Sequence, residues 1–149
     1  MAPRSRIALA LVALWPWPAL AEPAPPPPDL DCKIGFEALR NWATWLPGAE
    51  RQSAGGKNVI AVAVPDVWRV EISFTEPGQV GHPAVVLRKF VKQVTGVWTA
   101  QSKACGYGDQ AQFGDLMASM KAMDKTLTDA SRDEVERKVI ELSPLGGTP

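Results

Sequence analysis

The strongest constraint on the fold is the alternation of side chains over residues 67–75, VWRVEISFT. In an extended chain, its apolar side chains point to one face and its polar side chains to the other. The apolar set is Trp68, Val70, Ile72 and Phe74, and the polar set is Arg69, Glu71, Ser73 and Thr75. A period of two residues is that of a β-strand with one buried face. The rest of the chain must therefore supply an apolar layer to cover that face.

Three further segments have β-character, at residues 58–64, 84–93 and 97–105. The turns between consecutive segments are short, with EPGQ at 76–79 and Thr-Gly at 95–96. Because short turns join antiparallel neighbours, we predict an antiparallel meander of three to four strands. The polar stretch ERQSAGGK at 50–57 is predicted to be a loop, and Arg88, Lys89 and Lys92 are interpreted as basic residues that protect an edge strand from aggregation.

Helical periodicity flanks the strands on both sides. Residues 33–46 place an apolar set on one face, namely Ile34, Ala38, Leu39, Trp42 and Trp45, before Pro47-Gly48 ends the helix. After Asp109, a good N-cap, apolar residues recur at steps of three and four: Phe113, Leu116, Met117, Met120, Met123 and Leu127. Ser131-Arg132-Asp133-Glu134 has the spacing of a capping box and predicts a second short helix to residue 142.

Two sets of these helical residues also suggest ligands. Trp42 and Trp45 have the spacing to stack a ligand, and Met117, Met120 and Met123 have the softness to bind Cu(I). At helical spacing beside other apolar residues, both sets are predicted to fill the core or an interface instead. The order of elements predicts an α+β two-layer sandwich with an N-terminal helix and one or two C-terminal helices. This layout recurs in unrelated proteins and does not indicate an activity.

The N-terminus predicts export. Two arginines precede an apolar run at residues 7–20, and Ala19-Leu20-Ala21 has the small side chains of a cleavage site. We predict a cleaved signal peptide at 1–21 rather than a membrane anchor, because the apolar run is too short for a membrane span and is interrupted by two prolines. Residues 22–30 (EPAPPPPDL) are interpreted as a proline-rich spacer, 31–142 as one globular domain, and 143–149 as a disordered tail.

Composition excludes several function classes. The chain has 16 basic and 16 acidic residues, and cleavage removes Arg4 and Arg6, which leaves 14 basic against 16 acidic. Without a basic patch, nucleic acid is not an expected partner. One histidine and two cysteines do not make a zinc site, so we predict no metal and no cofactor. No apolar run long enough for a membrane span follows the signal peptide.

Cys32 and Cys105 are predicted to form a disulfide, because an exported chain meets an oxidising compartment and the cysteine count is even. Closing a loop of this length contributes about 4 kcal/mol in the chain-entropy account. The alternative is a reactive Cys105 thiolate near a helix N-terminus, with His82 as the base that a thiol enzyme needs. No CxxC motif is present.

The stretch ACGYGDQ at 104–110 joins the last predicted strand to the long helix. Its glycines are interpreted as turn formers, and a strand, a glycine turn and a helix N-terminus also suggest a backbone anion site. With His82, this stretch supplies the candidate binding surface, made of His82, Gly106, Tyr107, Gly108 and Asp109.

These observations predict a small exported, non-enzymatic protein in the periplasm or outside the cell, which binds a protein partner or a small ligand. One alternative is an enzyme that uses Cys105 or His82. Another is a structural accessory subunit of an envelope complex. Neither the ligand nor the oligomeric state follows from the sequence.

Intact mass of the exported protein tests both export and the disulfide. We expect a chain that begins at Glu22, no alkylation before reduction, and two alkylated cysteines after reduction, because both thiols are then released. A cysteine that is alkylated without reduction would contradict the disulfide and favour the thiol interpretation.

Overall fold

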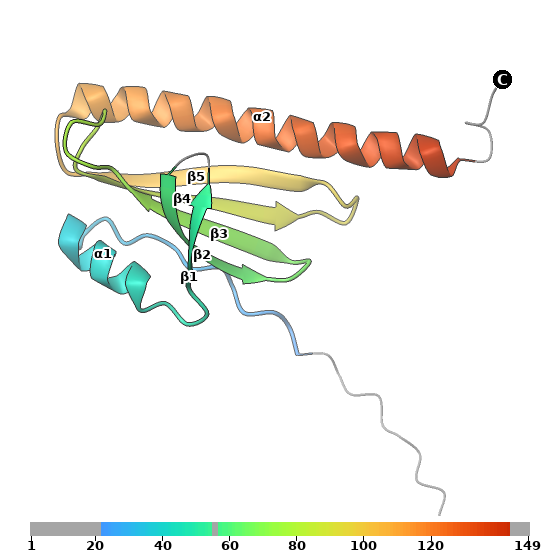
Figure 1. Cartoon of the computed structure of the whole chain (residues 1–149), viewed down its shortest axis with the longest axis horizontal. Helices are drawn as coiled ribbons and strands as arrows, with labels where there is room; N and C mark the ends of the chain where they lie inside the picture. The colour runs from blue at the N-terminus through green and yellow to red at the C-terminus, as the bar shows by residue number, and fades with distance from the viewer. Residues whose placement is uncertain (1–21, 55–56, 144–149) are drawn as a thin grey trace, which may run out of the picture.

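The computed structural model describes residues 22–54 and 57–143. The elements follow in the order α1 (Phe36–Thr44), β1 (Glu50–Ala54), β2 (Lys57–Val64), β3 (Trp68–Phe74), β4 (Ala84–Lys92), β5 (Trp98–Gly106) and α2 (Gln110–Leu142) (Figure 1). The predicted α+β class and antiparallel sheet are confirmed. The predicted signal peptide at 1–21 and all of the predicted tail except Ser143 lie outside the described residues.

The sheet has five strands in the order β1-β2-β3-β4-β5, and each pairs with its neighbour in antiparallel register. The additional strand is β1, which lies within the stretch predicted to be a loop. Glu50 pairs with Ala61 and Ala54 with Lys57. The sequence of β1 is polar and has no apolar alternation, so only its pairing with β2 makes it a strand.

The alternation of β3 places its apolar side chains in the main core. Trp68, Val70 and Ile72 are buried, and they share this cluster with Leu30, Leu39, Ala43, Val85, Leu87 and Cys105. The α1 helix contributes Leu39 and Ala43 to the cluster. Trp45 is not part of the core: it is 84% exposed, because α1 ends at Thr44 and Trp45 does not continue the buried face.

The proline-rich stretch at 22–30, interpreted from the sequence as a spacer, lies against the sheet. The indole Nε1 of Trp68 donates a hydrogen bond of 2.7 Å to the carbonyl oxygen of Pro25. A few residues later, Leu30 is buried in the main core. The segment is therefore attached to the sheet at Pro25 and at Leu30.

The basic residues of β4 do not protect an edge, because β4 pairs with β3 on one side and β5 on the other. Lys92 Nζ lies 2.8 Å from Asp66 Oδ1. Arg88 Nε lies 2.9 Å from Asp124 Oδ1 on α2, with both side chains largely buried. The edge-strand interpretation of Arg88, Lys89 and Lys92 is therefore wrong, and two of the three make specific ion pairs.

Of the one or two C-terminal helices predicted, the structure has one, α2, which is an unbroken helix of 33 residues, so no second helix begins at Ser131. In a capping box the serine hydroxyl accepts a hydrogen bond from the backbone N–H of the residue three positions later in the same helix. Here the Ser131 hydroxyl accepts instead from the backbone N–H of Trp98 on β5, at 2.9 Å. The motif has the right spacing, but its serine serves a tertiary contact.

Three α2 side chains bind the exposed edge of β5. Asp124, Thr128 and Ser131 accept hydrogen bonds of 2.6, 2.9 and 2.9 Å from the backbone N–H groups of Ser102, Ala100 and Trp98. The helix spacing of four and three residues thus matches the two-residue spacing of N–H groups along one edge of a strand. These N–H groups have no neighbouring strand, so the helix satisfies the edge that would otherwise be open.

The two helices lie on opposite sides of the sheet (Figure 1). Val85 and Leu87 of β4 share the core with α1, whereas the alternate residue Arg88 contacts Asp124 and Met120 of α2. The predicted two-layer sandwich is therefore incomplete, because a second helix covers part of the other face. We call that second face, which carries Val86, Arg88 and Phe90, the outer face.

Replacement of Asp124 by alanine tests the contribution of the helix–edge bonds. We expect Asp124→Ala to lower the free energy of unfolding by about 3 kcal/mol or more, because it leaves Arg88 and the Ser102 N–H without their partner in a largely buried place. Urea unfolding measures the change. Asp129→Ala, which removes a more exposed carboxylate of the same helix, is the control, and an equal loss in both variants would contradict the argument.

Candidate functional site

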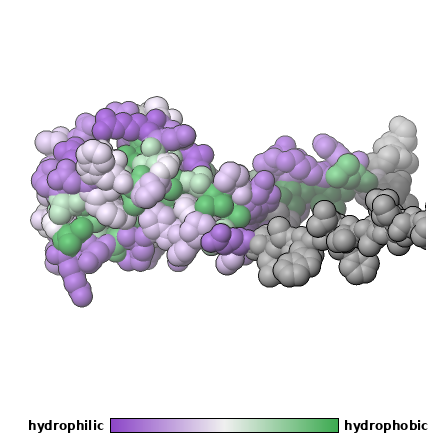
Figure 2. Space-filling view, turned by 90° about the horizontal axis from the view of Figure 1, so that it is seen from below, coloured by the Kyte–Doolittle hydropathy of each residue, from purple (hydrophilic) through white to green (hydrophobic). Residues whose placement is uncertain are grey.

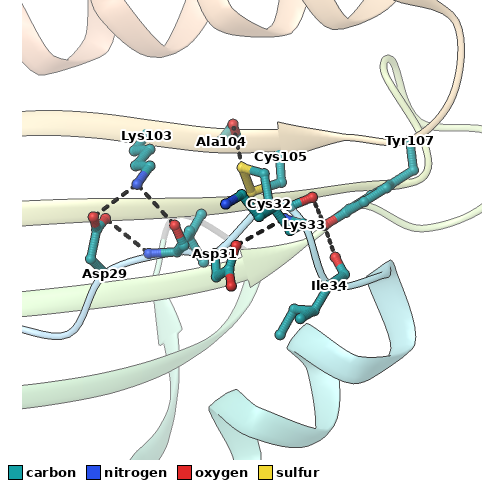
Figure 3. The surroundings of a disulfide bond; sticks show 10 residues. Asp29, Asp31, Cys32, Lys33, Ile34, Lys103, Ala104, Cys105 and Tyr107 are labelled. Carbon is teal, nitrogen blue, oxygen red and sulfur yellow. Dashed lines mark hydrogen bonds and ion pairs between the residues drawn. A yellow bond between two sulfur atoms is a disulfide. The ribbon is translucent and has the colours of Figure 1, made fainter.

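The disulfide predicted from the sequence is present and joins the segment before α1 to β5. The Cα atoms of Cys32 and Cys105 are 5.2 Å apart, and Cys105 is 1% exposed. Lys103 reinforces the same junction, since its Nζ contacts Asp29 Oδ2 at 2.8 Å and the Leu30 carbonyl oxygen at 2.9 Å (Figure 3). The N-terminal segment is thus held to β5 by a covalent bond and an ion pair.

The residues of the predicted binding surface do lie together, at the corner between β5 and α2. The Tyr107 N–H donates to the Pro83 carbonyl oxygen at 2.9 Å, and the His82–Pro83 peptide bond is cis. A Cβ atom on Gly108 would lie 2.4 Å from the His82 carbonyl oxygen. His82, Tyr107 and Gly108 are therefore neighbours, although His82 is far from the others in sequence.

The glycines of this corner have a different role from the predicted one. Neither Gly106 nor Gly108 has a positive φ, so the turn does not need their conformational freedom. What they provide is space: a Cβ atom on Gly106 would lie 2.4 Å from the ring of Phe113, and one on Gly108 would meet the His82 carbonyl. Close approach of α2 and the His82 loop to β5 is therefore the reason that both residues are glycine.

The polar side chains of the corner bond within the chain. His82 Nδ1 lies 2.9 Å from the Thr75 carbonyl oxygen, and Asp109 Oδ1 accepts from the Gln112 N–H at 2.8 Å. The Tyr107 hydroxyl donates to the carbonyl oxygen of Ile34 (Figure 3). Because the Asp109 carboxylate already caps the N-terminus of α2, an added anion would meet a negative charge there. The polar groups of this corner therefore hold α2, β5 and the His82 loop together.

The same geometry bears on the thiol alternative. Both cysteines are in the disulfide, and the described part of the chain has no free cysteine. His82 contacts the Thr75 carbonyl oxygen and packs in a T-shaped arrangement with the Phe36 ring, with ring centroids 5.8 Å apart. With the disulfide intact, Cys105 offers no thiolate for His82 to activate.

A groove that the sequence did not reveal lies between α2 and the outer face. Its volume is about 340 Å³, and its lining consists of Lys57, Val59, Glu71, Ser73, Val86, Arg88, Phe90, Met120, Met123 and Leu127. Met120 is buried, as predicted for the core, but Met123 is 45% and Leu127 36% exposed. Helical periodicity placed these residues on an apolar face without indicating that the sheet leaves part of that face open.

Of the three charged residues that line the groove, Arg88 and Glu71 are paired, whereas Lys57 makes no ion pair among the described residues. Arg88 and Asp124 form the ion pair at 2.9 Å, and Glu71 Oε1 lies 2.6 Å from Arg69 Nη2. The remaining surface is mainly aliphatic, thioether and aromatic. Ligand sites are typically concave and mostly apolar with a few polar groups, and this groove has that character.

Comparison with protein-family models, with curated proteins and with solved structures found no match for this chain. None of the helices in the described residues is long and apolar enough to cross a membrane.

The hydroxyl of Tyr107 gives the corner a measurable pH dependence. Burial raises the pKa of Tyr107 above its ordinary value of 10.0, and the Asp31 carboxylate nearby raises it further. A folded-state pKa above the unfolded value means that the stabilisation is complete below pH 10.0 and is lost as the pH rises through the folded-state pKa.

Tyr107 is the only tyrosine, so the ultraviolet absorbance of tyrosinate reports this residue alone. We expect it to ionise at higher pH in the native protein than in the urea-unfolded protein. We also expect Tyr107→Phe to weaken the loss of stability at alkaline pH. Identical titration of the native and unfolded chains would contradict the raised pKa of Tyr107 in the folded protein.

Proposed function

We propose that this chain is a small exported, non-enzymatic binding protein whose groove between α2 and the outer face receives the apolar part of a ligand. The ligand is either a small molecule or an apolar segment of a protein partner. The observation that supports this proposal is a mainly apolar groove that remains open between α2 and the outer face.

The construction of the groove favours binding. Its α2 wall is fixed to the edge of β5 by Asp124, Thr128 and Ser131, and the Arg88–Asp124 pair joins that wall to the sheet. Met123 and Leu127 therefore project from a helix that is held in place before any ligand arrives. A preformed site loses less conformational entropy on binding than a flexible one.

Export is supported by the Cys32–Cys105 disulfide, because such bonds persist in oxidising compartments such as the periplasm. The predicted signal peptide agrees with that location. The engagement of both cysteines in the disulfide removes the thiol that the enzyme alternative based on Cys105 requires. The carboxyl groups of Asp29 and Asp66 have lowered pKa values because Lys103 and Lys92 donate hydrogen bonds to them at the surface. Neither carboxyl group lines the groove, so these shifts do not indicate a catalytic acid or base there.

One observation favours the accessory-subunit alternative. The last turns of α2 extend past the sheet and carry Val139, Ile140 and Leu142 exposed to solvent. Figure 2 shows hydrophobic side chains among hydrophilic ones on this extension. An exposed apolar helix end is a candidate contact for another protein.

Two variants of α2 separate these functions. We expect wild-type protein to bind the uncharged fluorescent probe N-phenyl-1-naphthylamine in the groove, and Met123→Glu to weaken this binding roughly tenfold, because it places a charge on the apolar wall. Ile140→Glu makes a comparable change outside the groove and serves as the control.

The outcomes distinguish the two sites. No saturable binding to wild-type protein, or an equal loss in both variants, would contradict the groove as a ligand site. If a co-purifying complex is lost in Ile140→Glu and retained in Met123→Glu, the accessory-subunit alternative is favoured. Urea midpoints of the variants verify that each one is folded.

A further inference from the structure

A second cavity lies on the α1 side of the sheet, between α1 and the β1–β2 hairpin. Its volume is about 510 Å³. The residues that give it chemical character are Arg40 from α1, Arg51 and Ser53 from β1, Asn58 and Ile60 from β2, and Phe74 from β3. Ile60 and Phe74 rest on the main core, so the cavity has an apolar floor. We call it the arginine pocket.

The lining of the arginine pocket contains two arginines and no carboxylate. Arg40 holds its guanidinium 5.6 Å from the ring centroid of Phe36 and 5.8 Å from that of Phe74. Its acidic neighbour is Glu37 at 3.9 Å, and both side chains are half or more exposed, so this ion pair is weak. The charge of Arg40 is therefore mostly available to a ligand.

Arg51 makes no ion pair within the residues that the structure describes. Its chain neighbour Glu50 contacts Gln52 Nε2, and successive side chains of a strand point to opposite faces. The carboxylate of Glu50 is therefore directed away from the face of β1 that carries Arg51. Two guanidinium groups thus border one cavity whose lining contains no carboxylate.

Neutral hydrogen-bond donors complete the polar side of the pocket. Ser53 and Asn58 are register partners across the β1–β2 pair, so their hydroxyl and amide groups lie side by side. Together with Arg40 and Arg51 they offer donors to anionic oxygens. Guanidinium groups match the geometry of carboxylate and phosphate oxygens in particular.

From this arrangement we propose that the arginine pocket binds an anionic amphiphile, with its carboxylate or phosphate on Arg40 and Arg51 and its apolar part on Ile60 and Phe74. This site is separate from the groove under α2, and the proposal does not depend on the proposed function. It names a class of ligand, an acid or phosphate ester that carries a short apolar chain.

Binding of octyl phosphate to the mature, disulfide-bonded protein tests the proposal by calorimetry. Inorganic phosphate has the charge without the chain, and octyl glucoside has the chain without the charge. We expect octyl phosphate to bind more tightly than either, and its affinity to fall as salt is added. Arg40→Gln and Arg51→Gln should each weaken it at least about fivefold, since each removes a charge-assisted hydrogen bond.

The control is Arg137→Gln, the same change on an exposed part of α2, and it should leave the affinity unchanged. Equal binding of octyl glucoside would overturn the anionic part of the proposal, and equal binding of inorganic phosphate the apolar part. An equal effect of Arg137→Gln would show a general charge effect and overturn the site. Met123→Glu should leave octyl phosphate binding intact, so failure of the groove and failure of the arginine pocket are distinguishable.

Discussion

The rest of the structure depends most on the hydrogen bonds and the ion pair that the Asp124 carboxylate makes. It accepts from the backbone N–H and the hydroxyl of Ser102 on β5, and from Arg88 Nε on β4. One side chain thus joins the long helix to the sheet edge and to the outer face. Because the carboxylate is largely buried, each of these bonds matters more than it would in water. The position of α2, and with it the α2 wall of the groove, follows from this contact.

A second set of contacts attaches the N-terminal segment to β5 and to the main core. The Cys32–Cys105 disulfide and the Lys103–Asp29 pair attach the segment before α1, while Trp68 holds the proline-rich stretch through the Pro25 carbonyl. The strand at one edge of the sheet is therefore fixed by a helix on one side and by the N-terminal segment on the other. Two of the cavities in the described residues differ in character: the groove under α2 is mainly apolar, and the arginine pocket beside α1 has two guanidinium groups.

The parts of the fold that were predictable rest on local signals. The alternation at 67–75 identified β3 and its buried face, Asp109 identified the start of α2, and the two cysteines in an exported chain identified the disulfide. The predicted binding surface gathered residues that do lie together, but their polar side chains make hydrogen bonds to backbone groups of Thr75, Ile34 and Gln112. Residue type suggested these side chains as ligand contacts, but it did not indicate that they already make hydrogen bonds within the fold.

By itself, the sequence determined the antiparallel α+β class, the buried face of β3 and the pairing of the cysteines, because each depends on neighbours in the chain or on composition. The tertiary structure alone decided that polar β1 is a strand, that Ser131 binds β5 instead of capping a helix, and that Met123 and Leu127 border a groove. The two cavities belong to this second group. Their walls come from segments far apart in sequence, and no local pattern records which faces those segments leave uncovered.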